Sequence, residues 1–154
     1  MKGVRIALIG AFVLSAAPVA AQTARPVLDY AKAATIRDTC LAWAGERGLT
    51  VAVAVFDEGG KLLAFAHMDG AAHAVGGFAQ GKGRSAATVH VASSETANWG
   101  NGPPGLATWE GGLPIFSGQG VALGGIGVSG AESADDVACA RAGIAAAGRR
   151  ETAG

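Results

Sequence analysis

The sequence predicts an α+β fold in which one antiparallel sheet of about four strands is flanked by helices, in the order α-β-β-α-α-β-β-α. Two pairs of short apolar segments, each joined by a turn rich in glycine and polar residues, predict two β-hairpins. Helical periodicity precedes the first pair and follows the second. The 25 glycines of the 154-residue chain lie mostly between these patterned segments, which indicates tight turns rather than disorder.

The start of the chain has the three-part pattern of a secretory signal peptide. A short basic segment precedes an apolar run over residues 6–17, and Val19 and Ala21 occupy the −3 and −1 positions that a signal peptidase accepts. The apolar run is shorter than the roughly 20 residues needed to cross a bilayer. We therefore expect a cleaved signal over residues 1–21, a single mature domain over residues 22–154, and a periplasmic or secreted location.

The charge of the chain excludes some classes of partner. It has 12 basic and 12 acidic residues, and loss of the signal, which holds two of the basic residues, leaves 10 against 12. A nearly neutral domain lacks the basic surface typical of proteins that bind nucleic acid or anionic membranes. No segment after the signal is apolar enough to span a membrane. We expect a small-molecule ligand and no nucleic-acid or membrane partner.

Helices are predicted at both ends of the mature domain. The first spans residues 28–47, where apolar side chains recur every three or four positions and form one stripe. That stripe consists of Ala33, Ile36, Cys40, Trp43 and Ala44. The last helix is expected to begin with Ser133 as its N-cap. Asp135 and Asp136 then fall in its first turn, where carboxylates suit the positive end of the helix dipole.

The chain has two cysteines, Cys40 and Cys139, and each lies on the apolar face of one of these terminal helices. In an exported protein they can form a disulfide, provided that the two helices pack side by side. Two separate buried thiols explain the same positions equally well. A zinc site of the zinc-finger type is excluded, because only two cysteines are present.

The four strands are expected at residues 50–56, 61–68, 113–116 and 121–128. The first two are apolar on both faces, so we expect both faces of the sheet to be covered by helices or by another subunit. Between the hairpins, residues 71–89 predict a helix that is weakened by four glycines, each costing about 1 kcal/mol relative to alanine. A short helix over residues 93–99 and a loop over residues 100–112 follow.

A glycine-rich run at residues 124–130 has only a weak likeness to a nucleotide-binding loop. In a dinucleotide site the glycines lie in the turn that joins a strand to a helix of a parallel unit. Here several glycines fall within the predicted strand itself. We therefore favour close packing of the backbone or a bulge.

Three segments of the chain carry a resemblance to a known family. VAVAVFDEGGKLLAFAHMDGA (residues 51–71) is similar to the first hairpin of that family. GKGRSAAT (residues 81–88) is similar to its Lys-Ala-Arg-Thr-Ala helix start, with Lys82 and Arg84 in the matching places. GGLPIFSGQGVALGGIGVSGAESADDVACARAGI (residues 111–144) is similar to its second hairpin and last helix. In this order the segments cover most of the mature chain, which thus resembles the GlcG/HbpS family, related to the C-terminal domain of PduO-type proteins.

The resemblance implies a profilin-like α+β fold and assembly into a symmetric homo-oligomer. Some members of the family bind haem and some are exported, so haem is the cofactor that the resemblance suggests. The link to PduO-type proteins does not imply adenosyltransferase activity, because the catalytic part of those proteins is a different domain. Many members have no established function.

Haem iron needs an axial ligand inside an apolar pocket. The side chains that could supply it are Tyr30, His67, Met68, His73 and His90. His73 and His67 are the first choices for binding the metal. The aromatic side chains expected to line the macrocycle are Phe65, Phe78, Trp99 and Trp109. A hydrogen-bonded histidine on a sheet or loop surface is the alternative explanation for each histidine.

One departure from the family bears on this hypothesis. Some haem-binding relatives carry a histidine on the first helix, whereas this chain offers only Tyr30 and Arg37 there. Haem binding therefore requires a ligand elsewhere in the chain. Covalent attachment of the c type is excluded, because there is no Cys-x-x-Cys-His motif.

Lys82 and Arg84 are expected to bind carboxylates, such as haem propionates, because cationic side chains, and the planar guanidinium above all, pair with them. An equally good interpretation gives both residues structural roles, for example in bonding loop carbonyls or a neighbouring subunit.

Three functions remain open. The first is an exported protein that binds haem or a related tetrapyrrole. The second is a lyase or isomerase acting on an organic acid, with Lys82, Arg84 and a loop carboxylate, Glu95 or Glu110, in its site. The third is an accessory oligomer without a ligand. The sequence has no Gly-x-Ser-x-Gly motif, and whether the protein is an enzyme stays undecided.

Overall fold

The structure, a computed structural model, describes residues 24–100 and 105–154, so the predicted signal peptide lies outside the described residues. The elements in chain order are α1 (Tyr30–Gly45), β1 (Ala52–Asp57), β2 (Leu62–His67), α2 (Val75–Val89), α3 (Ser93–Thr96), the 3-10 helix η1 (Ala97–Trp99), β3 (Gly112–Phe116), β4 (Ala122–Ser129) and α4 (Ser133–Ala146).

The α+β prediction is confirmed, including the order of the elements. The hairpins β1–β2 and β3–β4 are antiparallel, and β1 also pairs antiparallel with β4, where Val55 lies opposite Ile126. The strand order is β2-β1-β4-β3. β1 and β4 are therefore central, and β2 and β3 form the two edges of the sheet.

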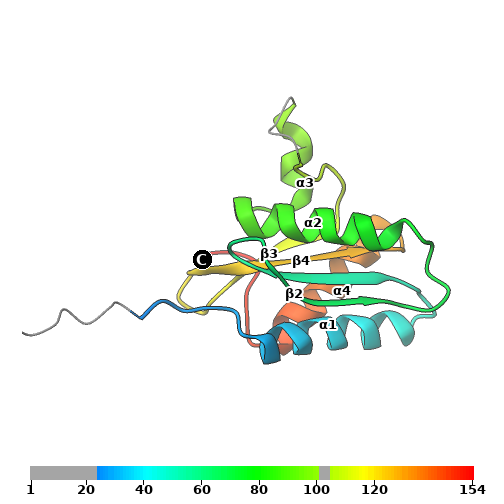
Figure 1. Cartoon of the computed structure of the whole chain (residues 1–154), viewed down its shortest axis with the longest axis horizontal. Helices are drawn as coiled ribbons and strands as arrows, with labels where there is room; N and C mark the ends of the chain where they lie inside the picture. Colours follow the sequence, from blue (N-terminus) through cyan, green and yellow to red (C-terminus); the bar gives the residue numbers. More distant parts are fainter. Residues whose placement is uncertain (1–23, 101–104) are drawn as a thin grey trace, which may run out of the picture.

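Helices lie on both faces of this sheet. Figure 1 shows α2 on one face and α1 with α4 on the other, while α3 stands away from the sheet beyond α2. The strand β1 connects the two layers because its side chains alternate. Val51, Val53 and Val55 pack in the core on the α1 and α4 side, and Phe56 packs in the core under α2. Burying each valine contributes about 1.5–3 kcal/mol.

The backbone of α2 lies close against the backbone of β4. A Cβ atom added to Gly127 would overlap the carbonyl oxygen of Ala79, and one added to Gly83 would lie 2.7 Å from the Gly127 nitrogen and 2.9 Å from the Ala54 oxygen. These glycines therefore allow a contact that no larger residue permits. The glycine run at residues 124–130 serves backbone packing, as its position in a strand indicated.

The prediction that both faces of the sheet are covered is confirmed, although the edge strand β2 is covered least: α2 packs mainly on β1 and β4, and Phe65 keeps 37% of its surface exposed. Two local predictions were wrong. The middle helix begins at Val75 rather than at residue 71, after a turn in which the Val75 N–H donates to Ala72. Ser133 is the first residue of α4, and the N-cap is Glu132, whose side chain makes no capping bond.

α1 and α4 pack side by side and are joined by a disulfide. Cys40 and Cys139 are bonded, with their Cα atoms 4.7 Å apart and 99 positions between them in the sequence. Both residues are buried. Among the described residues, no helix combines the length and the apolar character that crossing a bilayer requires.

Replacing both Cys40 and Cys139 by alanine should lower the free energy of unfolding by about 4–5 kcal/mol, because the disulfide closes a loop of about 100 residues in the unfolded chain. Urea unfolding followed by circular dichroism measures the change. Wild-type protein unfolded under reducing conditions should approach the variant, and the variant itself should not respond to the reductant. Equal midpoints for oxidised wild type and variant would contradict the prediction.

Alanine at Gly77 or Gly81 should stabilise the protein, by about 0.5–1 kcal/mol each. Both lie in α2 with ordinary helical backbone, and nothing lies within 4 Å of an added Cβ atom. Gly83→Ala in the same helix is the matched control and should destabilise by about 1–3 kcal/mol, because its Cβ would meet β1 and β4. The same urea titration tests all three, and stabilisation by Gly83→Ala would refute the packing argument.

Candidate functional site

Lys82 points from α2 into the core rather than toward solvent. Its residue is 5% exposed. The ammonium donates to the Val128 carbonyl at 3.0 Å, the Ser129 hydroxyl at 3.3 Å and the Asp136 carboxylate at 3.0 Å. An ammonium has three N–H donors, so all of them are used within the protein. The sequence left open whether Lys82 binds a ligand carboxylate or has a structural role. These three contacts match the structural role.

Asp136 is the partner that sequence reasoning missed. The sequence predicts it in the first turn of α4, where it suits the helix dipole; in the structure it is only 2% exposed and also accepts a hydrogen bond from the Ala131 N–H at 3.2 Å. Burial raises the pKa of this carboxyl, and the Lys82 ammonium and the Ala131 N–H oppose that rise. One signal was present: Asp136 lies four positions before Ala140, on the apolar stripe of its helix.

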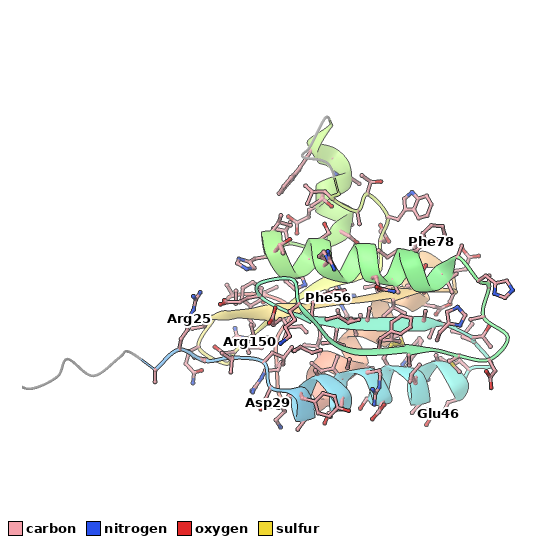
Figure 2. All side chains as sticks on the ribbon, viewed as in Figure 1. Arg25, Asp29, Glu46, Phe56, Phe78 and Arg150 are labelled. Atoms are coloured by element: carbon pink, nitrogen blue, oxygen red, sulfur yellow. A yellow bond between two sulfur atoms is a disulfide. The ribbon has the colours of Figure 1, made fainter. Side chains whose placement is uncertain are left out.

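Arg84 does not face the same region as Lys82. It is exposed on α2, with its guanidinium carbon 5.5 Å from the ring centroid of Phe56. Figure 2 shows Phe56 between α2 and the sheet, and Phe78 near the start of α2. The structure therefore does not bring the two predicted cations together into one binding site.

The predicted haem ligands and aromatics are also separated. Both ring nitrogens of His67 lie 3.2 Å from carbonyl oxygens, those of Met68 and Ala72. The side chains of His67 and Phe65 lie against Gly76 of α2. His73 is exposed in the turn before α2 and makes no hydrogen bond through its ring among the described residues.

Phe78 lies in a shallow apolar groove with Trp109. The two rings meet edge to face with centroids 5.0 Å apart, and the groove has a volume of about 270 Å³. It is lined by Gly77, Phe78, Gly81 and Lys82 of α2 and by residues 105–109. It has no histidine among its lining residues, so it offers no nitrogen ligand for iron.

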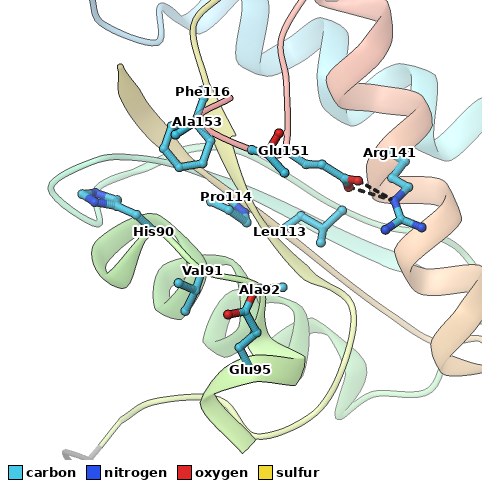
Figure 3. A pocket seen from close by; sticks show the side chains of 11 residues that line it. His90, Val91, Ala92, Glu95, Leu113, Pro114, Phe116, Arg141, Glu151 and Ala153 are labelled. Carbon is cyan, nitrogen blue, oxygen red and sulfur yellow. Dashed lines mark hydrogen bonds and ion pairs between the residues drawn. The ribbon is translucent and has the colours of Figure 1, made fainter. Parts of the chain in front are cut away.

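A second hollow lies along the outer edge of β3, and we refer to it as the β3-edge hollow. It has a volume of about 350 Å³ and is seen from close by in Figure 3. Its lining residues are His90, Val91, Ala92, Glu95, Leu113, Pro114, Phe116, Arg141, Glu151, Thr152 and Ala153. They come from β3, from the segment that joins α2 to α3, from α3 and α4, and from the end of the chain.

His90 reaches this hollow because α2 ends there in a left-handed conformation. His90 has φ 61° and is the C-cap, with its N–H donating to Ala86 at 3.0 Å. It is the only non-glycine residue with positive φ in the described part of the chain, and histidine is among the residues that tolerate it. The turn places its ring near Phe116, with centroids 6.4 Å apart. Neither ring nitrogen has a hydrogen-bond partner among the described residues.

Arg141 and Glu151 close the opposite end of the hollow (Figure 3). The Arg141 Nε donates to both carboxylate oxygens of Glu151, at 3.0 and 2.8 Å. Glu151 belongs to the C-terminal tail, residues 149–154. Backbone hydrogen bonds of 2.8 and 3.1 Å between Phe116 and Arg150 hold this tail on the end of β3.

The family model described as "Haem degrading protein HbpS-like" matches residues 28–145. The chain belongs to this HbpS-like family. The match extends from just before α1 almost to the end of α4, and it confirms the family that the three sequence segments indicated. The C-terminal tail lies beyond it.

Solved structures agree with this assignment. The crystal structure of HbpS is 31% identical, over 85% of this chain and 97% of that chain, with a TM-score of 0.74. A double mutant of HbpS from Streptomyces reticuli is 33% identical over the same shares, with a TM-score of 0.73. PduOC in a complex with heme is 20% identical, over 82% of this chain and 99% of that chain, with a TM-score of 0.75, and it supports the fold alone. No curated protein sequence matches this HbpS-like chain.

In this HbpS-like protein, Lys82→Met and Asp136→Leu should each lower the free energy of unfolding by about 3–5 kcal/mol, because each leaves a buried charge without its partner. The double variant Lys82→Met with Asp136→Leu should lose much less than the sum of the two. Lys61→Met, at an exposed lysine, is the control and should stay within about 0.5 kcal/mol of wild type. Additive losses in urea unfolding would rule out the coupling.

Proposed function

We propose that this protein binds haem, or a closely related tetrapyrrole, in the β3-edge hollow, with His90 as the iron ligand. The observation that carries the proposal is that this hollow places a histidine, whose ring nitrogens have no hydrogen-bond partner among the described residues, beside an apolar wall. Haem iron takes such a ligand in such surroundings. Both ring nitrogens of His67 face carbonyl oxygens at 3.2 Å, and His73 lines neither of the hollows described above. The proposed iron ligand is therefore His90, and not His73 or His67, which the sequence analysis favoured.

The residues present fit a flat apolar ring system. Leu113, Pro114 and Phe116 are buried residues of β3 that form one wall. The volume of about 350 Å³ is at the low end of the roughly 300–1,000 Å³ typical of ligand pockets, so part of a tetrapyrrole would extend beyond the hollow. Glu95 faces the hollow from α3 but is exposed, where solvent and salt screen its charge.

The relatives support the choice of ligand. The family is described as haem degrading, and the PduOC structure is a heme complex. When bound, haem supplies a redox-active iron. The protein's own part is to hold the ring and to offer the His90 nitrogen. The alternative function, a lyase or isomerase acting on an organic acid, loses its main support. The Lys82 ammonium is paired with Asp136, and Arg84 does not face the same region as Lys82.

We also propose that the protein acts outside the cytoplasm, in the periplasm or after secretion. The signal pattern over residues 1–21 supports this, and so does the disulfide, since disulfides persist in oxidising compartments. The symmetric homo-oligomer that the family resemblance implies stays a prediction of the same kind. Size-exclusion chromatography with light scattering on the mature protein measures it.

Titration of the mature protein with haemin should give a sharpened, shifted Soret band that saturates near one haem per chain. His90→Ala should abolish the shift, because it removes the iron ligand. His73→Ala and His67→Ala are matched controls and should keep it. Retention of the shift in His90→Ala with loss in His73→Ala would move the site to the turn before α2. A spectrum like that of free haemin for the wild type would refute haem binding altogether.

A further inference from the structure

Arg141 is the single lysine or arginine among the residues that line the β3-edge hollow. It also borders the two neighbouring hollows, one beside the C-terminal tail and one beside the start of β3. Its Nε is occupied by Glu151, while its two terminal nitrogens have no hydrogen-bond partner among the described residues. A guanidinium offers five N–H donors in a rigid plane, so four donors remain for a ligand.

The pair with Glu151 is exposed, with 59% and 34% of the two side chains accessible. Exposed pairs contribute little to stability. What this pair does fix is the direction of the Arg141 Nε–H bond, because that single N–H donates to both carboxylate oxygens of Glu151 and so limits the rotation of the guanidinium.

The position of Glu151 is in turn fixed by the C-terminal tail. Arg150 next to it makes two backbone hydrogen bonds with Phe116, and its Nη1 donates to the Gly118 carbonyl at 3.0 Å. Gly120, with φ 78°, leaves room for the backbone of Ala153, which a side chain at that position would overlap. The C-terminal tail therefore lies against the end of β3 and forms one wall of the β3-edge hollow.

We propose that Glu151 is a positioning residue that turns the free nitrogens of Arg141 toward a ligand carboxylate, so that the site selects tetrapyrroles with free propionates over their esters. This inference rests on the proposed haem function and narrows its ligand class. The carboxylate binds the terminal nitrogens through two N–H donors, in the planar geometry that arginine favours. Glu151 lies in the C-terminal tail, beyond residues 28–145 that the family model matches.

The test compares haemin with its dimethyl ester, which keeps the iron and the ring but lacks both carboxylates. Wild type should bind haemin more tightly than the ester. Arg141→Gln should weaken haemin about tenfold, as expected for loss of a charged hydrogen bond, and leave the ester unchanged. Glu151→Gln should weaken haemin binding about three- to fivefold, because the guanidinium is held less firmly.

The ligand-free proteins give a second readout, since Glu151→Gln should speed tryptic cleavage after Arg149 and Arg150.

Arg25 and Glu58 form a matched control pair, 3.0 Å apart and exposed, and neither lines the β3-edge hollow. Arg25→Gln and Glu58→Gln change the net charge in the same way and should leave both ligands unaffected. If either Arg141→Gln or Glu151→Gln binds haemin as tightly as wild type, or if the ester binds as tightly as haemin, the inference is overturned while the haem function stands. If wild type shifts the Soret band of neither ligand, the haem function itself fails, and this inference with it.

Discussion

The buried ion pair of Lys82 and Asp136 is the contact on which the arrangement of the molecule depends. It joins α2, on one face of the sheet, to the end of β4 and the start of α4, on the other face. Burying two charges is expensive unless both are paired and hydrogen-bonded, and here both are. The main chain of Lys82 also limits the start of β3, since a Cβ on Gly112 would lie 2.6 Å from the Lys82 oxygen. Lys82 therefore also takes part in packing α2, the helix that ends at His90, against β3, the strand that walls the hollow.

The two sides of the sheet are held by different means. α1 and α4 carry apolar stripes that pack on branched side chains, and the disulfide of Cys40 and Cys139 adds a covalent tie. α2 has four glycines in 15 residues, so its own helix propensity is poor. Tertiary contacts must therefore stabilise it: its backbone lies on the glycines of β4, and Lys82 anchors it to Asp136. The two faces of the sheet therefore differ. On the α2 side two backbones lie in close contact, whereas on the α1 and α4 side the contacts are made by side chains.

The elements could be predicted from the sequence because local signals specify them. Alternation in β1, the turns of both hairpins and the stripe of α1 each involve neighbours a few positions apart. The site could not be predicted, because it is made by contacts between distant segments. Lys82 and Asp136 are 54 positions apart. Considered alone, each residue is explained as an ordinary charged side chain of a helix, and nothing in the sequence pairs them. His90 was recognised as a candidate, but only the left-handed end of α2 places it beside Phe116. The role of Glu151 depends on how the C-terminal tail lies on β3.

The outer edge of β3 is poorly suited to pairing with an added strand. An exposed strand edge normally offers a row of backbone groups to another strand. On β3 the Gly112 N–H is taken by the Ser93 hydroxyl at 2.9 Å, Pro114 has no N–H to give, and Phe116 is paired with Arg150. Little donor capacity is left for an added strand, so recognition by backbone pairing is disfavoured. What remains exposed at this edge is side-chain surface, with a histidine at one end and an oriented guanidinium at the other. Such a surface suits a flat ligand that carries a metal and a carboxylate.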